Sequence, residues 1–447
     1  MKKLLLLFLT THVFYAYGQK PTADELASLG SIRILDEVEK QINTIAEVDS
    51  FRSIKAKSHF KNSYEIWFSQ PIDHNDTASK RFPQRVILGH VGFNEPVMVE
   101  LQGYSIRRTS SYELANYFKA NQLIIEHRYF AKSRPDSLDW NKLTTWQAAT
   151  DQHIVIEKIK TAVYPESKFI TTGISKGGQC TLLHNALYPK DAVASVPYVA
   201  PLNFAREDDR IYSFLKSVGT ARQRNQIETF QKLCLSKKDE LVPMLHAKAD
   251  KKGWRWNLST EKAFEYYVLE YSFAFWQWGR YDFDEIPNAR SSNEEILKHV
   301  LAVSGVSFFE ESGVEPQRPF FWVAHTEIGL YGYETVAFEK YLGTTEPYLF
   351  EFTLPVGTNP PYDPTAVKNV QKHLDTKAEN IFCIYGGMDT WSATKVELNA
   401  DAAKRNCFVY VFEDGHHQTR IKHFPKTERK DILERLEEIL EKKVDAY

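Results

Sequence analysis

The chain has 447 residues, 43% of them hydrophobic and 13% aromatic, which is enough apolar surface to bury a large core. This length suits one large domain that carries an insertion. The 56 Lys and Arg residues nearly balance the 58 Asp and Glu residues, and neither half is strongly basic, so the charge excludes electrostatic support for a nucleic-acid partner.

The N-terminus has the pattern of a cleaved signal peptide, which we expect at residues 1–18. Lys2 and Lys3 precede an apolar run, and the small-x-small triplet Ala16-Tyr17-Gly18 has the pattern of a cleavage site. The run is shorter than the roughly 20 residues that span a bilayer, and no later segment is long and apolar enough. The sequence therefore predicts a periplasmic or secreted protein without stable membrane insertion after signal cleavage.

Short apolar strands alternate with helices over residues 19–202, which is typical of a parallel sheet covered on both faces. Residues 203–355 are instead aromatic and helical, and the alternation resumes over 356–447. We therefore expect two core segments, 19–202 and 356–447, separated by a mainly helical cap. The predicted strands are 64–68, 85–88, 97–101, 123–126, 168–172, 192–199, 380–385 and 407–412, and the predicted helices are 145–163, 179–188, one that starts at Ala393, and 428–442.

A G-x-S-x-G motif at Gly173–Gly177 places Ser175 between a predicted strand and a predicted helix. A serine in this context lies on a sharp turn, where the flanking glycines allow neighbouring backbone to pass closely. The turn exposes the hydroxyl and directs the N–H of Lys176 toward a developing oxyanion. The motif alone is also compatible with an ordinary glycine-rich turn, but its strand–turn–helix setting favours a nucleophile.

A second oxyanion donor is expected from the loop after an earlier strand. The strand at 97–101 is followed by Gly103 and Tyr104, whose backbone N–H groups are the candidates. A plain strand-ending turn would have the same sequence.

The acid and the base are expected after the cap, because in the α/β-hydrolase fold they follow the serine in the order acid, then histidine. Asp389 follows the strand at 380–385, although an aspartate here can also cap a helix. His416 and His417 both follow the strand at 407–412, and only one can face the serine. The turn at Gly415 favours His417 as the general base. The sequence thus predicts an α/β-hydrolase fold with an inserted helical cap and a Ser175, Asp389 and His417 triad, with no cofactor and no metal site.

Further segments resemble one known family in their order along the chain. They are Phe68-Ser69-Gln70-Pro71-Ile72-Asp73-His74, Gln102-Gly103-Tyr104, Glu126-His127-Arg128-Tyr129-Phe130, Asp151-x-His153, Ser175-Lys176-Gly177-Gly178, Pro197-Tyr198-Val199-Ala200-Pro201, Asp209-Arg210, Val218-Gly219-Thr220, and Gly387-Met388-Asp389-Thr390-Trp391-Ser392. Together they resemble the prolyl tri/tetrapeptidyl aminopeptidases, bacterial secreted serine peptidases distantly similar to the lysosomal Pro-X carboxypeptidase group. The resemblance spans residues 64 to about 425.

The resemblance implies the same triad, and the stretch from His417 to Ile421 resembles the family's histidine loop, which again favours His417 over His416. Two departures are visible. Thr390 stands where relatives often have proline, and Ala221 stands where a cysteine is expected before Arg222. Neither departure touches the triad, but the second removes a potential disulfide partner. Pairing of the four cysteines is left open.

The activity that the resemblance implies is release of short N-terminal peptides by cleavage after proline, so proline-containing peptides are the expected substrates. Such a site needs flat rings around the pyrrolidine and an acidic group for the free amine. Trp391 and Tyr104 are candidate pocket walls, Trp276 and Trp278 of the cap are a candidate roof or core, and Glu126 is a candidate amine anchor or a buried partner of Arg128.

Two alternatives share these residues: a carboxylic-ester hydrolase of the same fold, and a non-catalytic exported binding protein. The intact serine, aspartate and histidine argue against the second. Asp151 and His153 are two residues apart on a helix and face different ways, so we expect packing or hydrogen bonding to the elbow rather than a metal pair.

Overall fold

The computed structural model describes residues 35–344 and 346–444, and the signal peptide expected at 1–18 lies outside them. The chain divides into two compact units, Met1–Thr44 and Ile45–Tyr447. In the first, the described residues form the short helix α3 (Glu37–Ile42). The Asp36 carboxylate accepts the Glu39 N–H and the Glu39 carboxylate accepts the Asp36 N–H, so a capping box starts this helix.

The second unit contains a nine-stranded sheet in the order β1-β2-β3-β5-β4-β6-β7-β8-β9. The first four strands of this order pair antiparallel, and the pairs from β5 to β9 are parallel. The central parallel strands are buried along their length, except for the partly exposed Ile174 at the end of β6, which explains why their sequences are largely apolar. The strands are β1 (Val48–Ile54), β2 (Asn62–Pro71), β3 (Arg81–His90), β4 (Val97–Leu101), β5 (Asn121–Ile125), β6 (Phe169–Ile174), β7 (Ala194–Tyr198), β8 (Phe382–Gly386) and β9 (Phe408–Phe412).

The strand order reverses at β4. The chain runs from β4 outward to β5 and then returns to β6 on the opposite side of β4. In open α/β sheets, ligands bind outside the carboxyl ends of the strands at such a switch point. The loops that begin at Gln102 and Ser175 leave the sheet there, so the topology alone places both candidate oxyanion segments at the expected binding edge.

Helices cover both faces of the sheet. On one face, α4 (Glu113–Phe118) and α15 (Lys426–Leu440) share an apolar cluster with β6 and β7. On the other face, α5 (Thr145–Ala162) packs against α6 (Lys176–Leu187), and α14 (Thr365–Thr376) packs against α6 in turn. This order of strands and helices is the α/β-hydrolase fold, as predicted.

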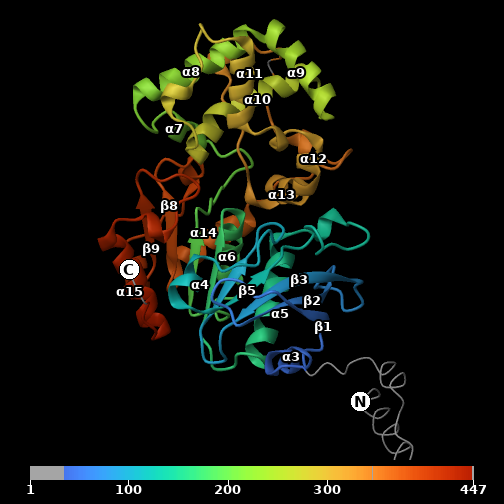
Figure 1. Cartoon of the computed structure of the whole chain (residues 1–447), viewed down its shortest axis with the longest axis vertical. Coiled ribbons are helices and arrows are strands. Elements are labelled where there is room, and N and C mark those ends of the chain that lie inside the picture. Colours follow the sequence, from blue (N-terminus) through green and yellow to red (C-terminus); the bar gives the residue numbers. More distant parts are fainter. Residues whose placement is uncertain (1–34, 345, 445–447) are drawn as a thin grey trace, which may run out of the picture. The chain divides into compact units, whose positions relative to one another are not determined.

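Between β7 and β8 the chain passes through a long, mainly helical segment. Figure 1 shows α8 to α11 as a layer separate from the sheet, with α12 and α13 between this layer and the sheet. The helices are α7 (Arg210–Leu215), α8 (Ala221–Ser236), α9 (Lys238–Lys252), α10 (Thr260–Trp278), α11 (Asn293–Ser304), α12 (Glu311–Val314) and α13 (Arg318–Val323). The aromatic face of α10 is buried in the core of this segment.

Short helical turns complete the chain. They are η1 (Trp140–Lys142), η2 (Phe283–Glu285), η3 (Val306–Phe308), η4 (Glu315–Gln317), η5 (Ala324–Ile328), η6 (Val336–Phe338), η7 (Glu351–Thr353), η8 (Thr390–Thr394), η9 (Ala402–Arg405) and η10 (Ile421–His423). The helix expected from Ala393 is wrong, because the described chain between β8 and β9 holds only η8, η9 and loops. Asn399 explains part of this: its amide donates to the Asp375 carbonyl and its side-chain oxygen accepts the Asp401 N–H, which competes with helical bonding.

A buried polar network joins β2, the loop after β5 and α5. Asp151 binds Arg128 through two hydrogen bonds, Nε to Oδ2 at 2.6 Å and Nη2 to Oδ1 at 2.7 Å. His74 Nε2 lies 2.7 Å from the same Oδ1. The remaining Arg128 donors reach the carbonyls of Pro71, Ile72 and Lys142. The Arg128 guanidinium therefore binds groups from each of the elements that this network joins.

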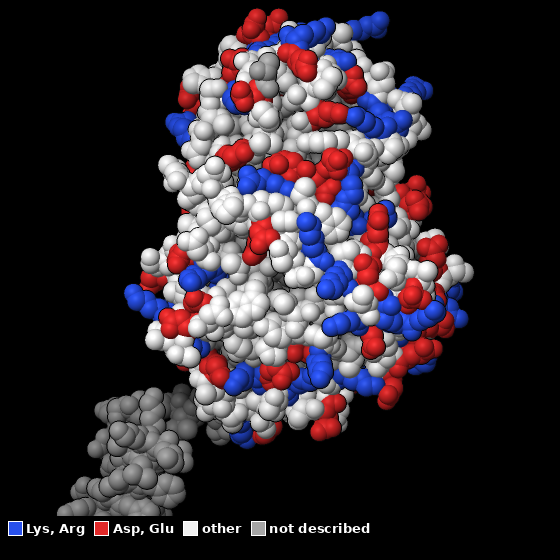
Figure 2. Space-filling model, turned by 180° about the vertical axis from the view of Figure 1, so that it is seen from behind, with Lys and Arg blue, Asp and Glu red and all other residues white. Residues whose placement is uncertain are grey.

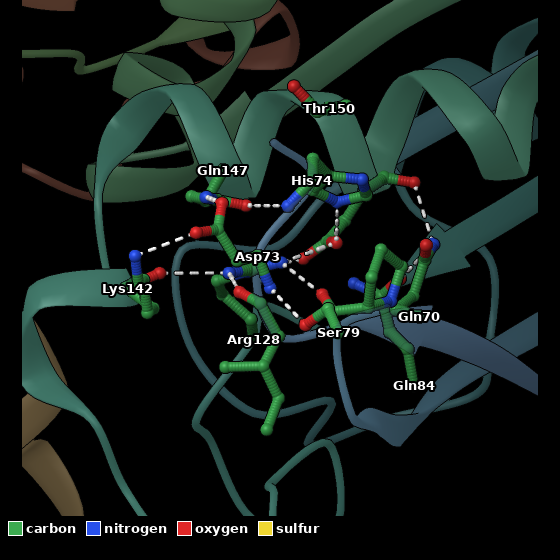
Figure 3. Close-up of polar contacts among 12 residues, drawn as sticks. Gln70, Asp73, His74, Ser79, Gln84, Arg128, Lys142, Gln147 and Thr150 are labelled. Carbon is green, nitrogen blue, oxygen red and sulfur yellow. Dashed lines mark hydrogen bonds and ion pairs between the residues drawn. The ribbon is translucent and has the colours of Figure 1, made fainter. Parts of the chain in front are cut away.

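Figure 3 shows Asp73 and its neighbours close to Arg128. Asp73 accepts hydrogen bonds from Lys142 Nζ and Gln147 Nε2, both at 2.7 Å. Gln70 donates to the Asp151 carbonyl at 3.1 Å. Asp151 and His153 form no hydrogen bond to the elbow, because Asp151 binds Arg128 and His153 lies 2.8 Å from Asp191. The helix that carries them does pack on α6, the helix of the elbow. Both residues support the packing of α5.

Within the described residues, all four cysteines are free and buried. No described helix is long and apolar enough to span a membrane. On the face drawn in Figure 2, basic and acidic side chains are interspersed rather than gathered into a large patch of one sign.

Replacing Asp151 with Asn is expected to lower the free energy of unfolding by about 3–5 kcal/mol, because the fully buried Arg128 guanidinium would lose its carboxylate. Urea unfolding followed by circular dichroism measures this loss. As a matched control, Asp401→Asn removes a carboxylate from an exposed pair with Lys404 and is expected to unfold at the wild-type urea concentration. Equal midpoints for the two variants would contradict the structural role of the Arg128–Asp151 pair.

Candidate active site

Ser175 lies on a tight turn between β6 and α6, with φ 59° and ψ −122°. A non-glycine residue rarely adopts this left-handed backbone, so the surrounding structure must hold it. A Cβ on Gly173 would lie 2.3 Å from the Gly177 carbonyl oxygen, and one on Gly178 would lie 2.7 Å from the Ala200 Cβ. The Ser175 N–H donates to the Tyr198 carbonyl at 2.9 Å. The glycines of the motif are thus required by close packing around the serine.

The Gly103 loop packs directly on this turn. A Cβ on Gly103 would lie 2.6 Å from the Lys176 Cβ and 2.7 Å from the Gly177 nitrogen. The N–H groups of Gly103 and Tyr104 donate to no acceptor within the described residues. Lys176 is the first residue of α6, so its N–H has no partner inside the helix. The structure therefore brings the three predicted oxyanion donors to the turn that carries Ser175.

Tyr104 adds a side-chain group that the sequence did not predict for this role. Burial raises the pKa of its hydroxyl, and the nearby Ser175 opposes this slightly. Tyr104 also packs edge-on against Phe130, with ring centroids 5.6 Å apart. A hydroxyl at this place can donate to an oxygen anion formed beside the serine.

The Lys176 side chain is buried without a carboxylate partner among the residues that the structure describes. Its exposed fraction is 3%, and its Nζ donates to the Gly103 carbonyl at 2.7 Å. The ammonium lies 5.2 Å and 5.7 Å from the ring centroids of Phe130 and Tyr104. Burial lowers the Lys176 pKa to about 8. This lysine thus fixes the Gly103 loop through one charged hydrogen bond.

Asp389 and His417 lie at the ends of β8 and β9, as expected. His417 Nδ1 is 2.7 Å from Asp389 Oδ2, and both side chains are buried. Asp389 Oδ1 also accepts the Trp391 N–H at 3.1 Å, so the carboxylate caps η8 and orients the imidazole. With Nδ1 facing the carboxylate, Nε2 is left to act as a base.

Ser175 and His417 line the same cavity, which has a volume of about 1100 Å³. No hydrogen bond joins their side chains in the described structure. Catalytic hydrogen bonds are often long or misaligned before substrate binds and tighten only in the complex. The geometry therefore fixes the Asp389–His417 pair by a hydrogen bond and places Ser175 in the cavity that His417 also lines.

His416 has a different role from His417. Its Nδ1 lies 2.6 Å from the Trp276 carbonyl, and the His417 N–H donates to the Gln277 carbonyl at 2.8 Å. Both acceptors belong to the last turn of α10. Gly279, with φ 53°, ends that helix where a Cβ would overlap the His416 ring. The histidine loop is therefore bound to the end of α10.

An aromatic wall forms one side of the cavity. Trp391, the predicted wall residue, meets Tyr331 edge-on at 5.4 Å and Phe273 edge-on at 5.2 Å, and these two rings stack at 3.8 Å. Trp278 lines the cavity as well and packs edge-on against His417 at 5.5 Å. The expected roof is only half right, because Trp276 is buried in the core instead.

Glu270 of α10 is a functional candidate that the sequence analysis missed. It is 3% exposed and lines the cavity, and its Oε2 accepts hydrogen bonds from Tyr331 at 2.9 Å and Tyr333 at 2.7 Å. Burial raises its pKa to about 8, against the opposing effect of the two tyrosines. The other two glutamates on this helix, Glu261 and Glu265, are instead paired with Lys238. The sequence feature that could have identified Glu270 is a glutamate inside an otherwise apolar helical stretch.

Glu126, the predicted amine anchor, does not line this cavity. Its carboxylate accepts the Ile106 N–H at 2.9 Å and the Ser133 hydroxyl at 2.7 Å. The alternative partner, Arg128, binds Asp151 instead, and Arg85 is the cation nearest to Glu126, at 3.8 Å. The carboxylate is fully occupied by the loops that surround it.

Lys176→Met is expected to lower kcat about tenfold with little change in KM, because the Gly103 loop loses the charged hydrogen bond that positions its N–H groups. Above pH 8 the wild-type lysine loses its proton, so its kcat should fall there relative to that of the methionine variant. Steady-state hydrolysis of a chromogenic peptide anilide measures both effects. The exposed Lys190→Met is the control, and equal kcat values for the two variants would contradict the positioning role.

The likeness to known proteins agrees with this geometry. Residues 44–429 match the family model of the PS-10 peptidase S37 family. The prolyl tri/tetrapeptidyl aminopeptidase of Streptomyces mobaraensis is 28% identical over 394 residues, which cover 86% of this chain and 82% of that protein.

Solved structures give more remote likenesses. A proline iminopeptidase from Mycobacterium smegmatis has a TM-score of 0.37 and 11% identity, covering 83% of this chain and 98% of that one. The carboxylesterase EstE1 from a metagenomic library has a TM-score of 0.34 and 7% identity, covering 90% of this chain and 94% of that one. The family match covers most of the chain, so the protein belongs to the PS-10 peptidase S37 family and is a serine peptidase of the α/β-hydrolase fold.

Proposed function

We propose that the protein is an exported serine peptidase that releases short N-terminal peptides by cleavage after proline. The observation that carries this proposal is the shared cavity: Ser175 and His417 line it together with the buried carboxyl of Glu270 and the aromatic wall at Trp391. The printed name of the Streptomyces mobaraensis relative supports the same activity. Export rests on the N-terminal pattern at residues 1–18, and we assign the cap to residues 203–355 and the core to 19–202 and 356–447.

The aromatic wall suits a proline side chain. The pyrrolidine ring is compact and apolar, and it packs well on the flat faces of aromatic rings. Trp391 follows the acid by two residues, so the wall lies beside the triad. Proline placed there presents its carbonyl carbon to the Ser175 hydroxyl.

Glu270 gives the cavity a group for the free N-terminus of a peptide. Its Oε2 is held by two tyrosines, while no hydrogen bond reaches Oε1 from any described residue. A substrate ammonium can donate to this oxygen, and a carboxylate–ammonium pair in a buried site is strong. The positions of Glu270 and Ser175 then limit how many residues can lie between the free N-terminus and the cleaved bond. This limit favours an exopeptidase over an ester hydrolase.

The chemistry follows from the triad. His417 accepts the Ser175 proton as the oxygen attacks the proline carbonyl, and Asp389 stabilises the imidazolium. The N–H groups of Lys176 and of Gly103 or Tyr104 stabilise the oxyanion. His417 then donates the proton to the leaving nitrogen, and the peptide bond breaks. In the second half of the reaction, His417 accepts a proton from water as the water attacks the acyl-enzyme, and then returns the proton to Ser175.

Ser175→Ala is expected to lower turnover about 10⁶-fold, because it removes the nucleophile. The wild type should cleave an Ala-Ala-Pro anilide faster than an alanine anilide or a short acyl ester. A fluorophosphonate probe should label the wild type and spare the variant. Absence of labelling would overturn the triad, whereas preference for the ester would favour a carboxylic-ester hydrolase of the same fold.

Glu270→Gln is expected to lower kcat/KM for a free-amine substrate about 10- to 100-fold relative to the N-acetylated substrate. Burial holds the wild-type carboxyl protonated below pH 8, and pairing with an ammonium requires the carboxylate. The wild-type preference for the free amine should therefore rise as pH approaches 8, and the variant should show no such rise. Glu265→Gln, on the same helix but outside the cavity, is the control. Equal discrimination by both variants would contradict the anchor.

A further inference from the structure

A second cavity, of about 580 Å³, adjoins the active-site cavity. The two share six lining residues: Glu100, Arg108, Tyr112, Ile174, Arg420 and Lys422. Ile174 immediately precedes Ser175, and Arg420 follows His417 by three residues. The second cavity therefore opens beside both the nucleophile and the base. Its volume is within the range of peptide and small-ligand sites.

The position of this cavity matches the departing half of a substrate. In acyl transfer the base gives its proton to the leaving nitrogen, so the leaving group lies on the histidine side of the serine. Arg420 extends this side, because its Nη1 donates to the Thr419 carbonyl at 2.6 Å and approaches the His417 carbonyl at 3.5 Å. Glu270 and Trp391, which serve the acyl half, line only the first cavity.

The charge of the second cavity is positive at neutral pH. Arg108 and Lys422 are exposed at its rim, and Arg420 is half-buried in its wall. Glu113 is already occupied: it accepts the N–H groups of Ile421 and Lys422 and the Tyr198 hydroxyl, each at 3.0 Å. Its carboxylate holds the loop and offsets part of the positive charge, that of Arg420.

Glu100 adds an unsatisfied polar group to the same cavity. The residue is 3% exposed, and its Oε2 has no hydrogen-bond partner among the residues that the structure describes. Burial raises its pKa to about 8, and Arg108 and Arg420 only partly oppose this. A buried carboxyl that is neutral at pH 7 can donate its O–H to an anion. An unpaired buried group of this kind is costly unless a ligand satisfies it.

We infer that the second cavity binds the C-terminal carboxylate of the departing peptide, through Arg108, Lys422 and the Glu100 hydroxyl. The enzyme would then favour short oligopeptides whose free C-terminus lies a few residues beyond the cleaved bond. This inference rests on the proposed function, since it requires cleavage at Ser175. It adds a second specificity element, set on the opposite side of the serine from Glu270.

The test compares peptides of Ala-Ala-Pro followed by one to four alanines, each as a free acid and as a C-terminal amide. The wild type is expected to prefer the acid at the best length by about tenfold in kcat/KM. The double variant Arg108→Met/Lys422→Met should lower this acid-to-amide ratio to near one. Lys426→Met, an exposed lysine outside both cavities, should keep the wild-type ratio.

A pH series adds a second readout. The groups that face Glu100 are Arg108, Arg420, Glu113, Tyr112 and Tyr198. As pH rises through 8, Glu100 ionises and repels a carboxylate, so the acid preference should fall. Glu100→Gln keeps a donor but cannot ionise, so its acid preference should stay flat over the same range.

Three outcomes would overturn the inference. They are a wild-type ratio near one at every length, a ratio kept by the double variant, and an amide peptide ending in glutamate that is cleaved as well as the free acid. The last would assign the cavity to an acidic side chain instead. Hydrolysis of the Ala-Ala-Pro anilide, which has no residue after the cleaved bond, reports on the proposed function alone. If the anilide is cleaved and the ratio is one, only the inference fails.

Discussion

The left-handed backbone of Ser175 is the constraint on which the rest of the site depends. It is held by contacts so close that glycine is needed at 173, 178 and 103. Because the Gly103 loop rests on the first turn of α6, one packing contact positions both the nucleophile and the groups that face its oxyanion. The acid and the base then need only extend from β8 and β9, the next two strands after β7 in the sheet.

Two buried cations show how charge is distributed around this turn. Arg128 is fully compensated by Asp151 and by three carbonyls, and it ties together β2, the loop after β5 and α5. Helix α5 packs on α6, so this network supports the elbow from behind. Lys176 has only a carbonyl and two aromatic rings. The charge of Lys176, which has no carboxylate partner among the described residues, thus lies beside the oxyanion site. The charge of Arg128, which Asp151 compensates, lies in the core.

Much of this arrangement could be predicted from the sequence because the signals are local. The strand–turn–helix around Ser175, the strand ends at Asp389 and Gly415, and the switch between alternating and helical patterns each lie within a few consecutive residues. The hydrogen bond between His417 and Asp389 agrees with the prediction that His417, rather than His416, is the base.

Glu270 and Glu100 could not be placed in the same way. Tyr331 and Tyr333 are distant in sequence from Glu270, and Arg420 is distant from Glu100; only Arg108 is near Glu100 in the chain. The hydrogen-bond partners of Glu126 and Asp151 could not be predicted for the same reason, since they come from other elements. The helix expected at Ala393 failed because side-chain hydrogen bonds from Asn399 compete with the backbone ladder.

The burial of all four thiols has a consequence for how this protein can be handled. Burial raises the pKa of Cys180, Cys234, Cys383 and Cys407, which keeps these side chains protonated and poorly nucleophilic. Stability in the described part of the chain comes from packing and polar networks rather than cross-links. The four buried, protonated thiols are therefore poor targets for alkylating reagents as long as the protein is folded.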